Sequence, residues 1–356
     1  MLDNVKTEPA IESEFYGYHN SDEVYLITLI NNGITVKITN FGCSITAINA
    51  PDRNGEIDNV VAGFKDIGSY NDNPHYLGCV LGRYAGRITK GRYEYNKETI
   101  QLSQNEQQNH LHGGFAGLNR KVWKVKSYIQ TDHEAGVIMQ YLSEDGEEGY
   151  PGNLWIDITY VLNANNQLSI TYNGTTDKTT PINLSNHSYF NLSGFKNGQI
   201  IQHLLQIDSS FYTEKNEDNL PTGKILNVEG SAVDFRSAKE IGRDIGELVY
   251  DMGYDHNFVL NEHLSGEVIK AATLEDPFSG RVLNVYTDQP AIQVYTANFW
   301  NKDIPGVHGI NYEKHAAVAL ETQNFPDAPN HLNFPDALLK PNERYSTKTV
   351  YEFVTK

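Results

Sequence analysis

The chain has 356 residues, a formal net charge of −17 and two cysteines, Cys43 and Cys79. Two thiols are not a disulfide framework, so the sequence does not call for an oxidising compartment. The negative charge repels nucleic-acid phosphates and anionic membrane surfaces, so we expect neither nucleic acid nor membrane as a partner. No apolar run approaches the roughly 18 residues that span a bilayer.

The N-terminal sequence "MLDNVKTEPAIESEF" is polar and acidic, and it lacks the basic start and apolar centre of a signal peptide. We therefore expect a cytoplasmic protein, although a chain whose secretion signal had been trimmed would read the same way. The length suits two small domains or one large all-β domain.

Alternation of apolar and polar residues predicts β-strands along most of the chain. Residues 24–42 read as two strands joined at Asn31-Asn32-Gly33, because Asn and Gly tolerate the positive φ of a tight hairpin. Residues 91–103 form a shorter pair around Asn96-Lys97. Further strands are predicted over residues 154–163, 167–174, 279–288, 291–299 and 316–325.

One helix is predicted over residues 237–250, "SAKEIGRDIGELVY", where Ser237 and Glu240 have the spacing of a capping box. Two interior glycines weaken it. The sequence shows no repeat and no linker-like composition, and the candidate site residues are scattered from Arg87 to Glu321. We therefore expect residues 1–356 to form a single domain, an all-β antiparallel sandwich with few short helices.

His187 lies in the polar stretch "TPINLSNHSYFNLSG". One interpretation is a buried structural histidine that its neighbours satisfy by hydrogen bonding. The other is a tuned acid, since an imidazole with a pKa of about 6.5 exchanges protons readily near neutral pH. In that case we expect the polar neighbours to orient the ring.

His110 and His112, in "NHLHGGFAG", share a face if the segment is a strand. Such a pair suggests a metal site, but the glutamate of the cupin pattern is absent, and glycines follow instead. The glycines suggest a backbone that a ligand approaches closely. We expect a structural role for His110 and no metal.

Arginines, an aspartate and a glutamate complete the candidates. Arg83 and Arg87 lie close together in "GRYAGRITKGRY", where a guanidinium can fork onto ligand hydroxyls. Asp255, in "GYDHNFVL", is either a turn former or an acceptor for sugar hydroxyls. Glu321 interrupts the apolar strand "AAVAL", and a carboxylate there costs several kcal/mol unless it is paired. Function and a structural ion pair are both open for Glu321.

Six motifs together resemble the aldose 1-epimerases, also called galactose mutarotases: "GRYAGRITKGRY", "NHLHGG", "NHSYFNLSG", "GYDHNF", "QPAIQVYTANF" and "LETQNFPDAPN". They occur in the order and spacing of the family and cover nearly the whole chain. The resemblance implies a β-sandwich of the galactose mutarotase-like type with an open cleft for a monosaccharide.

The resemblance also implies roles for individual residues. Glu321 corresponds to the general base of the family and His187 to its general acid. The residues that correspond to the sugar-binding set, or that lie beside it, are Arg87, His112, Asp255, Gln293, Tyr189 and Phe299. The family often has asparagine before its site arginine, whereas this chain has Gly86, so a hydrogen bond to the sugar is lost or only a backbone contact remains.

The expected reaction interconverts the α and β anomers of free aldoses such as galactose and glucose. It needs one group that removes a proton and one that donates a proton, and neither cofactor nor metal. We expect an ionised Glu321 and a protonated His187 in the productive form, and a monomer or homodimer. The alternatives are a sugar-binding module without turnover, a metal-dependent isomerase built on His110 and His112, and an epimerase of phosphorylated sugars.

Overall fold

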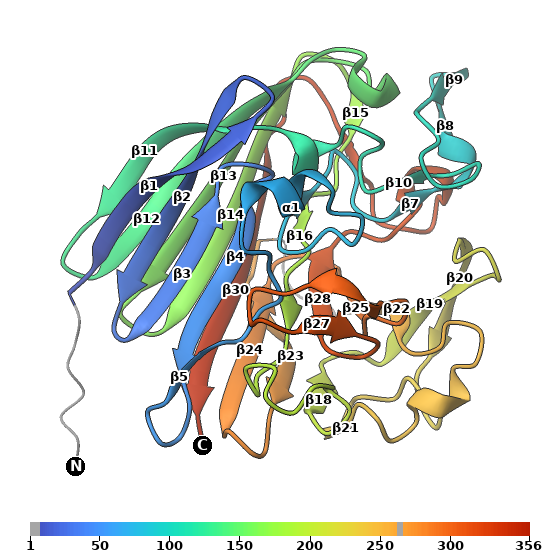
Figure 1. Ribbon diagram of the computed structural model, residues 1–356. Coiled ribbons are helices and arrows are strands. Elements are labelled where there is room, and N and C mark those ends of the chain that lie inside the picture. The colour runs from blue at the N-terminus through green and yellow to red at the C-terminus, as the bar shows by residue number, and fades with distance from the viewer. Residues whose placement is uncertain (1–7, 262–265) are drawn as a thin grey trace.

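Antiparallel sheets make up most of the computed structural model, which describes residues 8–261 and 266–356 (Figure 1). Residues 1–7, which belong to the polar N-terminal sequence that lacks the features of a signal peptide, lie outside the described residues. In spatial order, the nine-stranded sheet consists of β11 (Lys124–Gln130), β12 (Glu134–Ser143), β13 (Leu154–Asn163), β14 (Gln167–Thr176), β30 (Tyr345–Thr355), β24 (Arg281–Thr287), β23 (Ile269–Glu275), β18 (Leu204–Ile207) and β21 (Lys239–Glu240).

Two further sheets complete the main architecture. The five-stranded sheet consists of β1 (Ala10–His19), β2 (Asp22–Asn31), β3 (Ile34–Thr39), β4 (Ser44–Pro51) and β5 (Ile57–Asn59). The six-stranded sheet, in spatial order, consists of β17 (Tyr189–Phe190), β28 (Val318–Gln323), β25 (Ala291–Tyr295), β22 (Asp255–Val259), β19 (Phe211–Lys215) and β20 (Pro221–Asn227).

Short elements connect these sheets. The two-stranded pairs are β7 (Arg87–Ile88) with β10 (His110–Leu111), β16 (Ser185–Asn186) with β6 (Val80–Leu81), β15 (Thr180–Pro181) with β29 (Leu338–Leu339), β8 (Arg92–Tyr95) with β9 (Glu98–Gln101), and β26 (Asn301–Pro305) with β27 (Asn311–Glu313). The helical segments are α1 (Ile67–Asn71) and the 3-10 turns η1 (Thr89–Gly91), η2 (Leu118–Arg120), η3 (Glu147–Gly149), η4 (Ile245–Glu247) and η5 (Ala328–Asn330). Within the described ranges, no helix is long and apolar enough to cross a membrane.

One cluster of buried apolar side chains joins the three large sheets. It includes Leu29 of β2, Ile158 of β13, Val285 of β24 and Leu320 of β28. The nine-stranded sheet therefore packs against the other two, and the predicted antiparallel β-sandwich is confirmed (Figure 1).

The predicted hairpins are also confirmed. Asn32 and Gly33 adopt φ of +45° and +79° between β2 and β3, and Asn96 and Lys97 have positive φ between β8 and β9. These are the conformations that a tight antiparallel turn requires.

The predicted helix over residues 237–250 is wrong. The segment contains the strand β21 and the short turn η4 instead. Ile241 N donates to His203 O at 2.9 Å and Gly242 N donates to Ile201 O at 2.7 Å, so neighbouring chain takes up backbone donors that a helix would have used internally. Tertiary pairing outweighs a weak local preference that two glycines had already lowered.

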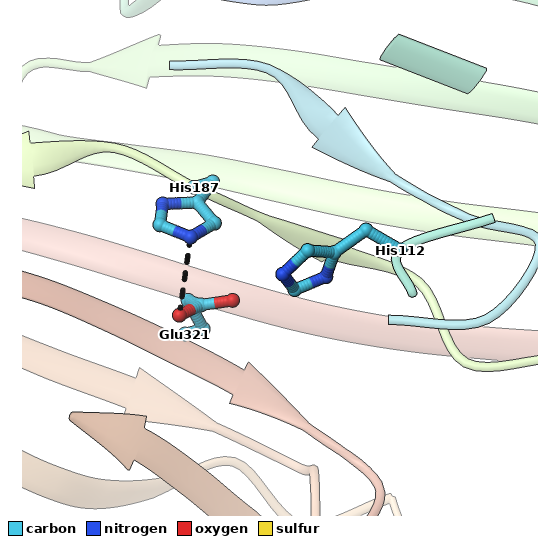
Figure 2. Close-up of side chains that lie close together, drawn as sticks. All are labelled: His112, His187 and Glu321. Carbon is cyan, nitrogen blue, oxygen red and sulfur yellow. Dashed lines mark ion pairs between the residues drawn. The ribbon is translucent and has the colours of Figure 1, made fainter. Parts of the chain in front are cut away.

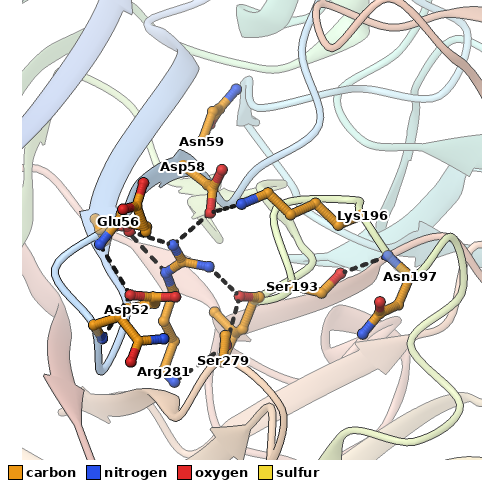
Figure 3. Close-up of polar contacts among 12 residues, drawn as sticks. Asp52, Glu56, Asp58, Asn59, Ser193, Lys196, Asn197, Ser279 and Arg281 are labelled. Carbon is orange, nitrogen blue, oxygen red and sulfur yellow. Dashed lines mark hydrogen bonds and ion pairs between the residues drawn. The ribbon is translucent and has the colours of Figure 1, made fainter.

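A buried arginine joins distant segments at one end of the nine-stranded sheet. Arg281, the first residue of β24, donates to the carbonyls of Ala50 and Leu192 and contacts Asp58 Oδ2 at 2.6 Å (Figure 3). It therefore connects the β4–β5 hairpin to the chain that follows β17, the strand next to His187.

Candidate active site

The nine residues that the family resemblance placed in or beside the site all line one cleft. Its volume is about 250 Å³, close to the small end of ligand pockets, which run from about 300 to 1,000 Å³. The nine are Gly86, Arg87, His112, His187, Tyr189, Asp255, Gln293, Phe299 and Glu321.

The six-stranded sheet forms the floor of this cleft. Its register places Asn257 of β22 opposite Gln293 of β25, and Gln293 opposite Glu321 of β28. Cross-strand partners point to the same face, so these polar side chains form a row. The alternate residues of the same strands, such as Val294 and Leu320, point to the opposite face and belong to the apolar core.

His187 continues that row. β17 pairs Tyr189 with Ala319 of β28, and the same register continued by two residues brings His187 opposite Glu321. The backbone of His187 is fixed by its N–H, which donates to Cys79 O at 2.8 Å, and by its carbonyl, which accepts from Gly78 N at 3.0 Å. Sheet register therefore explains why two residues 134 positions apart in the chain meet.

The polar neighbours of His187 do not orient its ring as the sequence predicted. The Asn186 side chain bonds Gly78 O and Ser188 N, which are backbone atoms. The ring instead packs against aromatic rings, with centroid distances of 4.6 Å to Tyr189 and 6.1 Å to Tyr76, and its Nδ1 has no hydrogen-bond partner among the described residues.

The distance from His187 Nε2 to Glu321 Oε1 is 3.6 Å (Figure 2). The two residues are only 4% and 2% exposed. Burial lowers the pKa of His187 to about 4, and burial, reinforced by the charge of Asp255, raises the pKa of Glu321 well above its usual value. Burial therefore favours the neutral form of each group, whereas the sequence predicted the two charged forms.

His112 approaches the same pair from the loop after β10 (Figure 2). Its Nδ1 accepts from Gly86 N at 3.1 Å, and its backbone N–H donates to Gly86 O, also at 3.1 Å. Burial, with His187 and Arg87 nearby, lowers the pKa of His112 well below its usual value, so the ring is neutral and carries its proton on Nε2. His112 is a neutral hydrogen-bond donor toward the cleft.

Gly86 contacts His112 through its backbone. It adopts a φ of +80°, and a Cβ at this position would lie 3.1 Å from Pro326 Cβ. The Gly86 N–H is engaged by His112 Nδ1, so the contact of Gly86 with a sugar stays a prediction.

Arg87 and Asp255 each have a partner that the sequence did not reveal. Arg87 Nε and Nη2 donate to the two carboxylate oxygens of Glu106 at 2.7 and 2.6 Å. Asp255 Oδ1 accepts from Gln293 Nε2 at 2.5 Å, and Lys215 Nζ lies 3.9 Å from Asp255 Oδ2.

Comparison with known proteins shows the family of this chain. The family model for aldose 1-epimerase matches residues 25–352. The chain belongs to the aldose 1-epimerase family. Galactose mutarotase from Mus musculus is 41% identical over 325 residues, which cover 91% of this chain and 92% of that protein. Aldose 1-epimerase from Escherichia coli K12 is 36% identical over 339 residues, or 93% and 95% of the two chains.

Solved structures share the fold. Galactose 1-epimerase from Lactobacillus acidophilus superposes with a TM-score of 0.85 at 28% identity, covering 98% of this chain and 99% of that one. An aldose epimerase homologue from C. elegans gives 0.83 at 29% identity, covering 91% and 96%. As a member of the aldose 1-epimerase family, the chain is an isomerase that acts on carbohydrate.

The donor set does not suit a metal, although one nitrogen or oxygen each from His112, His187 and Glu321 lies within 4.8 Å of the others. His112 Nδ1 already accepts a hydrogen bond, so Nε2 carries the proton and has no lone pair for a metal. His110 uses both ring nitrogens, with Tyr150 Oη at 2.6 Å and Ser103 O at 2.8 Å. A site built on His110 and His112 is therefore disfavoured in this aldose 1-epimerase, and the structural role expected for His110 fits its bonds.

Arg83 does not join the cleft. It is buried elsewhere and donates to Ser143 Oγ at 2.8 Å and to the carbonyls of Ser143 and Glu144, both at 2.8 Å. Of the two neighbouring arginines, only Arg87 lines the cleft.

The two aromatic candidates occupy different levels of the cleft. Tyr189 is 1% exposed and packs between His187 and Trp300, whose ring centroid is 4.7 Å away. Phe299 is 51% exposed and lies among the lining residues, so it presents its ring to solvent or to a ligand.

The sequence analysis missed Asn257 and Gln323. Both line the cleft, both are buried, and neither Asn257 Oδ1, Asn257 Nδ2 nor Gln323 Oε1 has a hydrogen-bond partner among the described residues. Each stands two positions after a candidate, Asp255 or Glu321, so strand alternation was the signal that could have found them.

Proposed function

We propose that this aldose 1-epimerase interconverts the α and β anomers of free aldoses such as galactose and glucose, with Glu321 as general base and His187 as general acid. The observation that carries the proposal is the 3.6 Å approach of His187 Nε2 and Glu321 Oε1 in the floor of a cleft of monosaccharide size.

Ring opening is a balanced proton exchange. Glu321 removes the proton of the C1 hydroxyl, the C1–O5 bond breaks as the C1 carbonyl forms, and His187 delivers a proton to O5. Rotation about C1–C2 presents the other face of the aldehyde, and the reverse transfers close the ring. Each positioned proton transfer contributes about 10²–10⁴-fold.

Burial of the pair fits this exchange. Opening starts from ionised Glu321 with protonated His187 and ends with neutral Glu321 and neutral His187, the pair that burial favours. The two forms hold one proton between them and differ only in its place, so the enzyme alternates between them without exchanging a proton with solvent.

Other cleft residues hold the sugar in this proposal. His112 and Arg87 donate toward the ring oxygen, where negative charge develops, and Asp255 and Gln293 bind hydroxyls. Among the side chains that line the cleft, the buried atoms without a partner among the described residues are His187 Nδ1, Asn257 Oδ1, Asn257 Nδ2, Gln293 Oε1, Glu321 Oε2 and Gln323 Oε1. Buried polar atoms are normally paired, and most of these are acceptors, so a ligand rich in hydroxyl donors complements them. Tyr189 and Phe299 supply apolar surface for a sugar face.

The Glu321→Gln variant tests the assignment. We expect turnover of freshly dissolved α-galactose, followed by polarimetry, to fall about 10²–10⁴-fold, because the amide cannot accept the C1 hydroxyl proton. Galactose affinity, measured by calorimetry, should change little. Glu275→Gln is the control, since Glu275 pairs with Lys356 at 2.5 Å outside the cleft lining. Turnover near that of the parent protein in Glu321→Gln would remove Glu321 as the base.

A further inference from the structure

Two cations line the sugar cleft, and each already has a carboxylate partner behind the lining. Arg87 and Lys215 are the only arginine and lysine among the described residues that line the cleft. Their partners, Glu106 and Asp251, are not part of the lining.

The Arg87 guanidinium is held at two points. Nε and Nη2 each donate to one oxygen of Glu106, the geometry in which arginine also grips a carboxylate or phosphate of a ligand. Glu106 is fixed in turn, because its backbone exchanges two hydrogen bonds with Asn109, at 3.1 and 2.8 Å. Only Nη1 of Arg87 makes no hydrogen bond within the described part of the chain, and it can still serve a neutral oxygen.

Lys215 is neutralised in a similar way from another segment. Its Nζ lies 2.9 Å from Asp251 Oδ1 and donates to Asn219 Oδ1 at 2.6 Å. Asp255 Oδ2, at 3.9 Å, adds a second carboxylate on the cleft side. The ammonium therefore has two oxygens within hydrogen-bond distance, one of them a carboxylate oxygen, and a second carboxylate nearby.

Among the residues that the structure describes, an anionic sugar therefore meets no positive charge in this cleft that lacks a carboxylate partner. The carboxylates of Glu106, Asp251 and Asp255 outnumber Arg87 and Lys215, and like charges held close together cost several kcal/mol of binding free energy in a site sheltered from water. We propose that Glu106 and Asp251 are specificity-determining residues that restrict the cleft to uncharged aldoses. This inference rests on the proposed function, because it assumes that the sugar binds beside Arg87 and Lys215.

The test compares galactose with galacturonic acid, which replaces the C6 hydroxymethyl group with a carboxylate. Mutarotation of both sugars is followed by polarimetry for the parent protein, Glu106→Gln and Asp251→Asn. We expect the parent protein to prefer galactose strongly, and the ratio of kcat/KM for galactose to that for galacturonate to fall roughly tenfold or more in at least one variant. Asp157→Asn is the control, because Asp157 pairs with Lys126 at 2.6 Å away from the cleft, and its ratio should equal that of the parent protein.

The salt dependence of turnover shows whether a variant gains activity on galacturonate through electrostatics or through a general loosening of the cleft. Raising ionic strength from about 0.05 to about 0.5 M should reduce the increase in galacturonate turnover, because salt screens the cation that has lost its carboxylate partner. Galactose turnover should stay nearly unchanged. A parent protein that uses both sugars equally well would overturn the inference, as would an unchanged ratio in both variants. A parent protein that fails to accelerate galactose mutarotation would instead overturn the proposed function.

Discussion

The burial of His187 and Glu321 sets the number of protons that the pair can hold. Taking either charged form out of water is costly, so the imidazole is hard to protonate and the carboxyl is hard to ionise. At pH values between the pKa of His187 and the raised pKa of Glu321, the pair holds one proton, which is the state that an acid–base exchange requires. Because the groups titrate together, a pH profile reports the pair rather than either residue.

This argument predicts a displaced pH profile. As pH falls through about 4, His187 gains a proton while Glu321 keeps its own, so no base remains and turnover is lost. As pH rises past the raised pKa of Glu321, the pair loses its last proton and no acid remains. Polarimetric kcat/KM for galactose, corrected for spontaneous mutarotation at each pH, measures both limbs. An acidic limb near 6.5, the pKa of an exposed imidazole, would contradict the burial argument.

The sequence revealed some site residues and hid others for a physical reason. Glu321 was detectable because a carboxylate within an apolar strand is costly, and a local pattern shows it. Glu106 and Asp251 gave no such signal, because a solvated acid and the partner of a half-buried cation look alike in a sequence. Their pairing with Arg87 and Lys215 depends on which segments the fold brings together.

At the scale of elements, one carboxylate accepts hydrogen bonds from the loop that follows His112. Glu148, in η3, accepts from the backbone N–H groups of Phe115 at 3.0 Å and Ala116 at 2.9 Å, and also from Ser103 Oγ. Gly114 permits this approach, since a Cβ there would collide with the Glu148 carboxylate. His112 itself has a φ of +52°, so the loop conformation needs such support.

Gly114→Ala should therefore damage catalysis through His112. The added methyl group pushes Glu148 away from the loop, and a displacement of about 1 Å at a catalytic group can cost about 10²-fold in rate. Gly33→Ala is the matched control, because Gly33 also has a positive φ, +79° against +98°, and no atom of the described residues beyond its chain neighbours lies within 4 Å of its added Cβ. Polarimetric kcat/KM should fall only in Gly114→Ala. Equal values in the two variants would mean that the clamp does not position His112.

Elements were predictable where local and tertiary preferences agree. The hairpins at Asn32-Gly33 and Asn96-Lys97 follow from residues that tolerate positive φ, and the fold preserves them. Residues 237–250 had only a weak helical pattern, and the backbone groups of residues 201–203 pair with Ile241 and Gly242 instead. No local pattern shows such a partner.

At the scale of the whole molecule, the cleft depends on how the sheets are joined. The floor strands present polar residues to the cleft and apolar residues to a core shared with the other sheets, which supports the proposal that the chain folds as one domain. Arg281 reinforces this join through Asp58, a carboxylate that also accepts from Lys196 Nζ at 2.8 Å (Figure 3). The same acid thus has one buried and one exposed cationic partner.

These two partners should differ greatly in their contribution to stability. Arg281→Met leaves Asp58 without its buried partner and strips hydrogen bonds from the carbonyls of Ala50 and Leu192, so the free energy of unfolding should fall by about 3–5 kcal/mol. Lys196→Met removes only an exposed pair and should cost at most about 1 kcal/mol. Urea denaturation of the two variants and the parent protein measures both losses. Similar losses in both variants would show that burial of Arg281 adds nothing to the join between the sheets.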